Sequence, residues 1–174
     1  ESKAVLIKKA QKILLPGVGS FDAAMKRINT SPDLLEVLHY KAKVDRIPIL
    51  GVCLGMQLLT RSSEEGTLPG LDWIPASTMR IPKIDGLKVP HMGWNIAKPS
   101  QSSLFTNNID NTSRYYFVHS FCVHVDNPKN SLMKTNYGID FDSAIRKENI
   151  YGVQFHPEKS HKFGMQILKN FSKL

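Results

Sequence analysis

Short apolar runs and segments of helical periodicity follow one another through the first third of the chain. Residues 12–15 and 48–52 are apolar runs of the length expected for buried parallel strands. Helical patterns occupy residues 21–28 and the segment after residues 31–32, and a further pattern starts at Leu54. This order of strands and helices predicts an α/β fold with a mostly parallel sheet flanked by helices.

The second half of the chain contains further strand patterns and one helical pattern. Residues 115–125 alternate and are rich in aromatic and β-branched side chains, which predicts one strand. Residues 141–146 and 150–155 predict two strands joined by a turn, and residues 161–171 predict an amphipathic helix that covers the sheet. Residues 2–10 have no start signal of their own, so we expect a short helix or an edge segment there.

Cys53 lies at the junction between an apolar strand and a helix. Gly51 and Gly55 lie two positions to either side of it, as a tight strand-to-helix turn requires, because larger side chains would collide with neighbouring backbone. The positive end of the following helix favours the thiolate, which is the reactive form of cysteine. Cys53 is therefore a candidate nucleophile, and the alternative is an inert cysteine packed in the core.

His156 follows an apolar strand, and Glu158 comes two positions later. Residues two apart in an extended segment project to the same side, so the Glu158 carboxylate can orient the His156 ring. A thiol, an imidazole and a carboxylate have the roles of nucleophile, base and orienting group in a catalytic triad. Together with Cys53, these residues predict acyl transfer through a thioester.

The carbonyl group that Cys53 would attack needs hydrogen-bond donors for its oxyanion. The candidate donors are the amide of Leu54, at the start of the helix, and a flipped amide at Gly17-Val18. Glycines on both sides of Val18 allow the backbone to approach a ligand closely or to rotate its peptides. The alternative for this segment is an ordinary turn.

The composition favours one globular domain over residues 1–174 and argues against several classes of partner. No apolar run has the length of a membrane span, and no secretory signal is visible. The formal charge is +8, but the basic residues are scattered and no nucleic-acid-binding motif accompanies them. A disulfide between Cys53 and Cys122 would consume the candidate nucleophile, so we expect a reducing, cytoplasmic setting.

The spacing of histidine and cysteine does not indicate a metal site, and no cofactor is expected. CxxC and HExxH patterns are absent, and Pro157 prevents the helix that could bring His156 together with a second histidine. We interpret His119, Cys122 and His124 as structural residues of a strand.

Six motifs, in the same order and over nearly the whole chain, resemble those of the class I (triad) glutamine amidotransferases. They are PGVGSF, GVCLGMQ, SEEG, VPHMGWN, YYFVHS and YGVQFHPEKS. PHMGWN and FHPEKS narrow the resemblance to the glutaminase subunits of imidazole glycerol phosphate synthases. The resemblance implies a flavodoxin-like fold and hydrolysis of L-glutamine to glutamate and ammonia. The ammonia would pass to a separate (β/α)8-barrel subunit in a heterodimer that serves histidine biosynthesis.

The resemblance also assigns roles to residues at matching positions. The nucleophile, the base and its orienting group would be Cys53, His156 and Glu158. The flexible oxyanion strand would contain Gly17 and Val18. The contacts to glutamine would come from Gln57, Glu65, Ser120 and Phe121, the last two through their backbone. The region facing the ammonia gate of the barrel subunit would contain Trp94 and Lys159.

Two features depart from the family pattern. Family members begin with a strand, a glycine-containing loop and a helix that this sequence lacks. A sheet without an inner strand would expose apolar edges, so we expect the sequence to be incomplete at its N-terminus. Phe121 stands where the family often has tyrosine, which loses little if only its backbone is used.

The sequence leaves two alternative functions open. The segments TRSSEEG, GLDWIPA and HPEKSHKFG are also similar to a paralogous branch, whose barrel partner aminates a nucleotide-linked sugar for surface polysaccharide. The second alternative is a non-catalytic regulatory subunit, although the intact Cys53, His156 and Glu158 argue against it. A cysteine protease or a γ-glutamyl hydrolase would share the turn at Cys53 but not the partner-facing segments.

Overall fold

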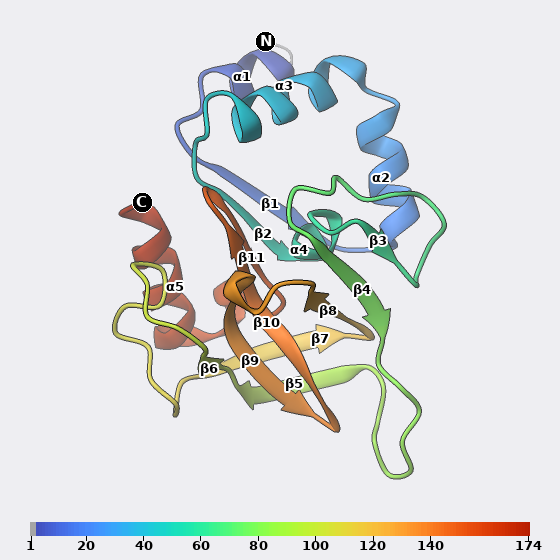
Figure 1. The fold of residues 1–174 in the computed structure, drawn as a ribbon, viewed down its shortest axis with the longest axis vertical. Helices are drawn as coiled ribbons and strands as arrows, with labels where there is room; N and C mark the ends of the chain where they lie inside the picture. Colours follow the sequence, from blue (N-terminus) through green and yellow to red (C-terminus); the bar gives the residue numbers. More distant parts are fainter. Residues whose placement is uncertain (1–2) are drawn as a thin grey trace.

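The computed structural model describes residues 3–174 (Figure 1). In chain order, the elements are α1 (Lys3–Lys8), β1 (Ile13–Gly17), α2 (Phe21–Asn29), α3 (Pro32–Lys43), β2 (Ile49–Cys53), α4 (Leu54–Leu58), β3 (Ser62–Ser63), β4 (Ala76–Arg80), β5 (His91–Ile96), β6 (Lys98–Pro99), β7 (Arg114–His119), β8 (Phe121–Val125), the 3-10 turn η1 (Pro128–Asn130), β9 (Ser131–Tyr137), β10 (Ile139–Lys147), β11 (Ile150–Val153), the 3-10 turn η2 (Pro157–Lys159) and α5 (His161–Ser172). Ser2, where the expected first segment begins, lies outside the described residues.

The central sheet is mixed (Figure 1). Within residues 3–174 it contains nine strands, in the order β1-β2-β11-β10-β8-β4-β3, with β9 beside β10 and β6 beside β9. β1, β2 and β11 are parallel, whereas β10 runs antiparallel to β11, β8 and β9. The predicted α/β fold is confirmed, but the sheet is not mostly parallel, because the second half of the chain returns through hairpins and short connections rather than helices.

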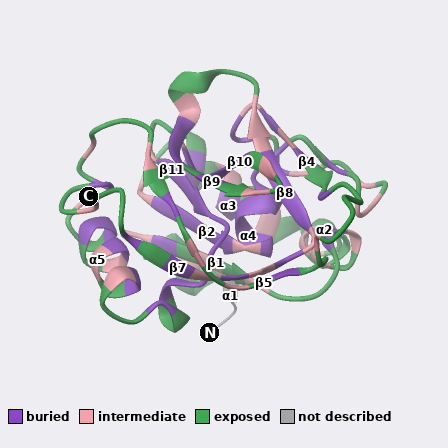
Figure 2. Ribbon diagram, turned by 90° about the horizontal axis from the view of Figure 1, so that it is seen from below, coloured by how far each residue is buried: buried purple, intermediate pink, exposed green. Residues whose placement is uncertain are grey.

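β2 is buried on both faces of the sheet (Figure 2). Ile49 belongs to an apolar cluster with side chains of α2, α3 and α4, whereas Leu50 and Val52 belong to a second cluster with β7, β10 and α5. Successive residues of a strand point to opposite faces, so burial on both sides requires a continuous apolar run. The position of β2 between two layers of side chains therefore explains the apolar run at residues 48–52.

The predicted helices are present and cover the sheet. α2 begins after Ser20, whose hydroxyl oxygen accepts a hydrogen bond from Ala23 N at 3.4 Å. α3 has Pro32 at its first position, where the missing N–H costs nothing. α5 buries Ile167 and Phe171 against the second apolar cluster. The predicted antiparallel pair of strands in the last third of the chain is also confirmed, as β10 and β11.

The aromatic segment 115–125 forms two strands, and not the single strand predicted. β7 and β8 are separated at Ser120; β7 pairs with β5, whereas β8 pairs with β4 and β10. The alternation of side chains continues across this break, so the sequence pattern does not reveal it. The break matters because it places Ser120 at the same cavity as Cys53, the last residue of β2.

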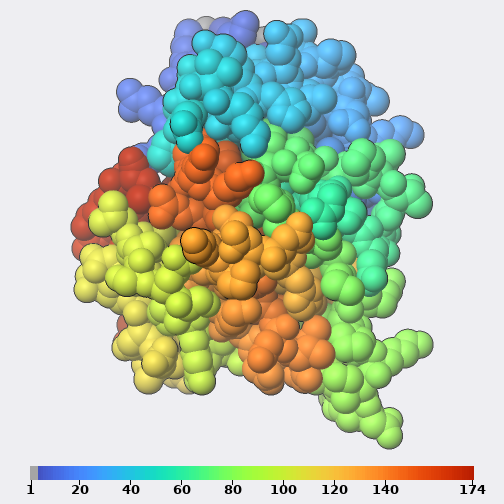
Figure 3. Space-filling view, viewed as in Figure 1, coloured from blue at the N-terminus to red at the C-terminus, as the bar shows by residue number. Residues whose placement is uncertain are grey.

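One end of the molecule is formed by helices, and the other carries a projecting connection between two strands (Figure 3). α1 and α3 form a helical cap at one end, and the connection between β4 and β5 projects at the other. The projecting connection is tied to the sheet where the Tyr137 hydroxyl donates a hydrogen bond to Lys88 O at 2.7 Å. In the described part of the chain, no helix has the length and apolarity to cross a membrane.

Candidate active site

Cys53 lies at a strained turn between β2 and α4. Its φ of 54° and ψ of −111° are outside the regions that residues other than glycine normally occupy. A Cβ atom at Gly55 would lie 1.7 Å from the carbonyl oxygen of Leu15, and one at Gly51 would lie 2.6 Å from the backbone of Gly55. Close backbone contacts therefore require both glycines, as predicted, and the turn presents Cys53 at the carboxyl end of the parallel strands.

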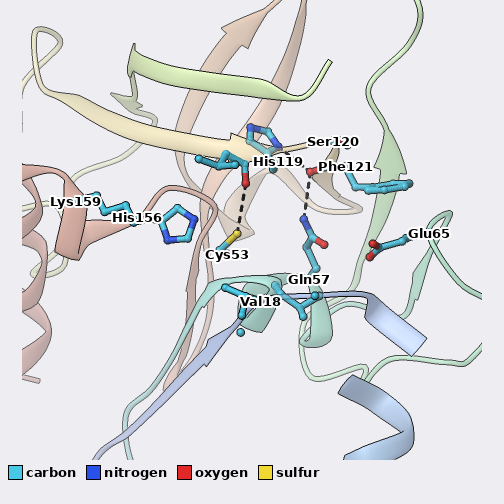
Figure 4. Close-up of a pocket in the computed structure, with 13 residues that line it drawn as sticks. Val18, Cys53, Gln57, Glu65, His119, Ser120, Phe121, His156 and Lys159 are labelled. Atoms are coloured by element: carbon cyan, nitrogen blue, oxygen red, sulfur yellow. Dashed lines mark hydrogen bonds between the residues drawn. The ribbon is translucent and has the colours of Figure 1, made fainter. Parts of the chain in front are cut away.

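A cavity of about 320 Å³ opens over this turn (Figure 4). The carboxyl ends of β1 and β2, the start of α4, the β7–β8 break and the segment after β11 form its walls. The predicted site residues that line it are Gly17, Val18, Cys53, Leu54, Gln57, Glu65, Ser120, Phe121, His156 and Lys159. The other two predicted residues, Glu158 and Trp94, lie outside this lining.

Burial has the largest effect on the pKa of the Cys53 thiol. It raises the pKa of Cys53 to about 11, and the Glu158 charge acts in the same direction. The Leu54 amide, the Gln154 side chain and the Lys159 charge favour the thiolate, but their combined effect is smaller. The helix start thus favours the thiolate, as predicted, but burial outweighs this effect and the net shift of the pKa is upward. The helix that begins at Leu54, α4, has five residues. With a pKa of about 11 the thiol is protonated at neutral pH, so attack by its sulfur needs a base to remove the proton.

His156 is held in the orientation that a base requires. Its Nδ1 lies 2.8 Å from Oε1 of Glu158, so Nδ1–H donates to the carboxylate and Nε2 keeps a lone pair for a proton. Figure 4 shows the ring beside the Cys53 sulfur. His156 N donates to Tyr116 O at 2.9 Å, and the Ser160 hydroxyl donates to His156 O at 2.6 Å. The histidine backbone is thus fixed on both sides.

Gln57 and Glu65 place oxygen acceptors away from the Cys53 end of the cavity (Figure 4). Gln57 Nε2 donates to Phe121 O at 3.2 Å and to Gln154 Oε1 at 3.1 Å, whereas Oε1 of Gln57 has no hydrogen-bond partner within residues 3–174. Oε2 of Glu65 accepts from Phe21 N at 3.0 Å, and its Oε1 also lacks a partner in the described part of the chain. Two unused oxygen acceptors suit a cationic group such as an ammonium.

The segment predicted to supply an oxyanion donor passes beside the start of α4. Gly17 pairs in register with Cys53, and a Cβ atom on Gly17 would lie 3.1 Å from Cβ of Leu54. Val18 is 88% exposed, and Gly19 has a φ of 100° with open space around it. These features leave the peptide between Gly17 and Val18 room to rotate. The oxyanion role of Gly17, Val18 and Leu54 stays a prediction.

Trp94 and Lys159 belong to an exposed aromatic cluster beside the cavity. Trp94, on β5, is 46% exposed and stacks on His161, with ring centroids 5.5 Å apart. Lys159 lines the cavity, and its Nζ lies 6.0 Å from the centroid of the Tyr116 ring. Met92, on the same strand as Trp94, is 62% exposed. Large apolar side chains grouped with a cation at the surface are typical of a protein interface.

Sequence reasoning missed three residues that shape the site. Gln154 is fully buried, donates from Nε2 to Cys53 Sγ at 3.7 Å and accepts from Gln57. The sequence feature that could have identified Gln154 is a single amide side chain within the apolar segment 150–155. The Ser160 hydroxyl joins the segment after β11 to the backbone of β7. His119, interpreted as structural, lines the cavity.

Histidine and cysteine side chains meet in pairs at most within residues 3–174, as His91 and His119 do at 2.8 Å. No group of three or more His, Cys, Asp or Glu side chains in the described residues is arranged to hold a metal ion. Cys53 and Cys122 are both free thiols, and Cys122 is fully buried, as predicted for a core residue. Of the two, Cys53 is the one that lines the cavity.

Known proteins similar to this chain point to one family. The sequence profile described as "Glutamine amidotransferase class-I" matches residues 1–174. "Imidazole glycerol phosphate synthase subunit HisH" of Bdellovibrio bacteriovorus is 50% identical over 168 residues, which cover 95% of this chain and 82% of that protein. "Imidazole glycerol phosphate synthase subunit HisH 2" of Methanococcus maripaludis is 51% identical over 168 residues, which cover 97% of this chain and 83% of that protein.

Solved structures share the fold at low sequence identity. A glutamine amidotransferase superimposes with a TM-score of 0.70 at 12% identity, over 98% of this chain and 84% of that one. The glutaminase domain of CTPS from Trypanosoma brucei superimposes with a TM-score of 0.63 at 16% identity, over 98% and 74%. With a family profile that matches residues 1–174 and relatives about half identical to it, this chain belongs to the class I glutamine amidotransferases.

Proposed function

We propose that this chain is the glutaminase subunit of an imidazole glycerol phosphate synthase, which releases ammonia from L-glutamine for histidine biosynthesis. The observation that carries the proposal is the cavity that contains Cys53, His156 and Glu65. It combines a nucleophile and a base with separate acceptors for the ammonium group of an amino acid. The names of the relatives, which are about half identical to this chain, support the pathway.

Hydrolysis begins with removal of the Cys53 proton. His156 Nε2 accepts this proton while the sulfur attacks the side-chain amide carbon of glutamine, and Glu158 stabilises the imidazolium that forms. His156 then gives the proton to the leaving nitrogen, so that ammonia departs and a γ-glutamyl thioester remains on Cys53. A water molecule, deprotonated by His156, hydrolyses the thioester to glutamate and restores the thiol.

The amino-acid end of glutamine lies toward Gln57 and Glu65. Their unused Oε1 atoms accept hydrogen bonds from the α-ammonium group, and the backbone of Ser120 and Phe121 forms part of the cavity wall. The Phe121 ring lies under the Arg80 guanidinium, 4.7 Å from the ring centroid, and the predicted contact to glutamine uses only the Phe121 backbone. A phenylalanine therefore serves this position as well as the tyrosine common in the family.

The negative oxygen of each tetrahedral intermediate needs two donors. The Leu54 amide, which forms a hydrogen bond with the Cys53 thiol, is one of them. Rotation of the peptide between Gly17 and Val18 supplies the other, at the exposed end of β1. This rotation is a conformational step, and a partner protein that favours the rotated peptide would raise the rate of glutamine hydrolysis.

The exposed cluster around Trp94 is the docking surface for a (β/α)8-barrel subunit. It includes Met92, Trp94 and Tyr116, and Lys159 belongs to both this surface and the cavity lining. Ammonia released at Cys53 therefore leaves beside the interface rather than into bulk water. A barrel that binds here also closes the cavity and lowers the local dielectric constant around the reacting groups.

The direct test measures glutamate released from L-glutamine by this chain mixed with a histidine-pathway barrel subunit, with and without the nucleotide ligand of the barrel. We expect release that increases with the ligand, and none with Cys53→Ala or His156→Ala. Labelling of Cys53 by a glutamine-like electrophile without stimulation by this barrel would indicate the polysaccharide branch. Absence of both labelling and hydrolysis would indicate a non-catalytic subunit.

A further inference from the structure

Two buried histidines lie side by side behind the cavity wall. His91 on β5 and His119 on β7 are direct cross-strand partners, and both side chains are almost fully buried. Nδ1 of His91 lies 2.8 Å from Nε2 of His119. Nδ1 of His119 lies 2.8 Å from the carbonyl oxygen of Phe121. The two rings thus form a continuous hydrogen-bonded path from β5 to the backbone of the cavity wall.

The direction of every bond in this path follows from its last member. A carbonyl oxygen can only accept, so Nδ1 of His119 carries the proton that bonds to Phe121 O. Nε2 of a neutral His119 must then accept, so Nδ1 of His91 carries the second proton. Nε2 of His91 in turn accepts from the side-chain amide of Asn95 at 3.3 Å. The hydrogen-bond partners therefore assign both rings to the Nδ1–H tautomer. This assignment follows from the donors and acceptors around the rings and does not depend on their apolar contacts.

Burial keeps both rings neutral. Desolvation lowers the pKa of His91 to about 4 and the pKa of His119 to about 3. For His119, the Phe121 carbonyl opposes this effect, whereas His91 and His156 reinforce it. A proton on Nε2 of His119 would remove the acceptor for His91 and break the path, whereas one on Nε2 of His91 would remove only the acceptor for Asn95. Because both rings stay neutral, the path persists at neutral pH.

The path ends at the carbonyl oxygen of Phe121, which also accepts a hydrogen bond from Gln57, a predicted glutamine-binding residue. Phe121 O accepts from His119 and from Nε2 of Gln57, at 3.2 Å. The second Nε2 hydrogen of Gln57 bonds to Gln154, so the orientation of its amide is fixed and Oε1 is available in the cavity. His119 and Phe121 themselves line the cavity together with Ser120 (Figure 4).

We propose that His91 and His119 are positioning residues for glutamine: together they hold the Ser120–Phe121 backbone and, through Phe121 O, the Gln57 side chain in the glutamine-binding orientation. This inference rests on the proposed glutaminase function. The histidines act through the backbone and through Gln57, and neither takes part in the transfer of protons at Cys53. Their loss affects the binding of glutamine more than the chemical step.

Packing alone is the competing explanation, because both rings also contact aromatic side chains. His91 stacks between Phe117 and Tyr137, with ring centroids 4.7 Å and 3.9 Å away. A hydrophobic residue of similar size would satisfy this packing but not the hydrogen bonds. An asparagine at position 119 would do the reverse, since its Nδ2 can occupy the place of the histidine Nδ1 and donate to Phe121 O.

The test compares His119→Leu, His119→Asn and His91→Leu in the complex of this chain with the barrel subunit. We expect His119→Leu and His91→Leu to raise the KM for glutamine about tenfold or more with a smaller change in kcat, and His119→Asn to return the KM to within about threefold of wild type. His39→Leu is the matched control: His39 Nδ1 accepts a bond from Trp73 Nε1 at 3.0 Å on the α3 side of the sheet, outside the cavity lining. It should leave the KM unchanged.

A second measurement on the wild-type chain does not depend on activity or on the folding of a variant. Nitrogen-15 chemical shifts of the histidine rings should show His91 and His119 as neutral Nδ1–H tautomers between pH 6 and pH 8. An Nε2–H tautomer at His119, an unchanged KM in the leucine variants, or His119→Asn no better than His119→Leu would overturn the proposal. Failure of the proposed function is a separate result, because wild-type chain with its barrel would then release no glutamate.

Discussion

Nε2 of Gln154 lies 3.7 Å from the sulfur of Cys53, and the same side chain accepts a hydrogen bond from Gln57. Gln154 thus connects the candidate nucleophile to the residue predicted to bind the amino-acid end of glutamine. Gln154→Leu should lower kcat/KM for glutamine by about tenfold to a hundredfold, because Gln57 loses an acceptor and the sulfur loses a donor. Steady-state glutaminase kinetics of the complex measure this effect.

A buried amide elsewhere provides the control for Gln154. Asn170, on α5, donates to the carbonyl oxygens of Phe105 and Asn107 at 2.8 Å and 2.7 Å, outside the cavity lining. Asn170→Leu should lower the free energy of unfolding by about 1–3 kcal/mol and leave the KM for glutamine unchanged. If both variants alter the kinetics equally, Gln154 acts only through stability.

The Glu158 carboxylate is 57% exposed, yet it is the partner of His156 Nδ1. Glu158→Gln keeps the shape of the side chain but removes the charge that stabilises the imidazolium. We expect kcat to fall by about tenfold to a hundredfold with little change in the free energy of unfolding. Glu148→Gln is a matched control, because Glu148 is similarly exposed and pairs with Arg46 rather than with a cavity residue. An unaffected kcat in Glu158→Gln would remove this residue from the triad.

The raised pKa of Cys53 gives the stability of the protein a specific pH dependence. The thiol titrates near 9.0 in an unfolded chain and at about 11 in the folded one, so the folded state binds the proton more tightly. The corresponding stability is present below pH 9 and is lost as the pH rises to 11. By pH 10.5 the loss should be about 2 kcal/mol.

Comparison with Cys53→Ala isolates this contribution from other alkaline titrations. Denaturant unfolding at pH 8 and pH 10.5 should show a loss of stability that is larger for wild type than for Cys53→Ala. Cys122 is present in both proteins, and burial raises its pKa to about 12, so its contribution cancels. Equal losses would mean that Cys53 ionises as readily in the folded chain as in the unfolded one.

Trp94 is the aromatic residue at the centre of the proposed docking surface, where it contacts Tyr116 and His161. Trp94→Ala should weaken binding of the barrel subunit by about tenfold or more, because aromatic residues often dominate interface energies. Tyr40→Ala is the control, since Tyr40 is 53% exposed on α3, among the helices that cap the other side of the sheet. Titration calorimetry measures both, and equal affinities would place the interface elsewhere.

Gly55 allows α4 to approach β1, because a Cβ atom there would lie 1.7 Å from Leu15 O. Gly55→Ala should therefore cost about 3 kcal/mol or more of stability, since backbone on both sides must move apart. In Gly152→Ala the new Cβ would lie 2.7 Å from Cγ of the buried Met56 side chain. A side chain shifts more readily than backbone, so the cost of this change should be smaller. Chemical denaturation compares the two, and a larger loss for Gly152→Ala would contradict this account.

Local features of the sequence predicted the parts of the site that depend on adjacent residues. The apolar run before Cys53, the flanking glycines and the His156–Glu158 spacing each act over a few residues, and the structure places them as expected. The break at Ser120 could not be predicted, because it depends on β7 pairing with β5 while β8 pairs with β4. Gln154 was missed for a similar reason, since its partners lie 97 and 101 residues away.

The upward direction of the Cys53 pKa shift could not be predicted from the sequence either. A helix start after a cysteine favours the thiolate only while the thiol stays solvated. The walls that bury Cys53 come from β1, β7 and the segment after β11, and none of them is adjacent to it in the chain. Tertiary burial therefore outweighs the local helix effect, and the proposed reaction relies on His156 to remove the thiol proton.

The left-handed backbone at Cys53 has a consequence for directed evolution of this protein. Glycine adopts a φ of 54° and a ψ of −111° without strain, whereas any side chain at this turn opposes folding to some degree. A laboratory selection that rewards thermal tolerance alone would thus tend to replace Cys53 by glycine and discard its chemistry. Only a selection that also demands turnover would retain a sulfur atom at this turn.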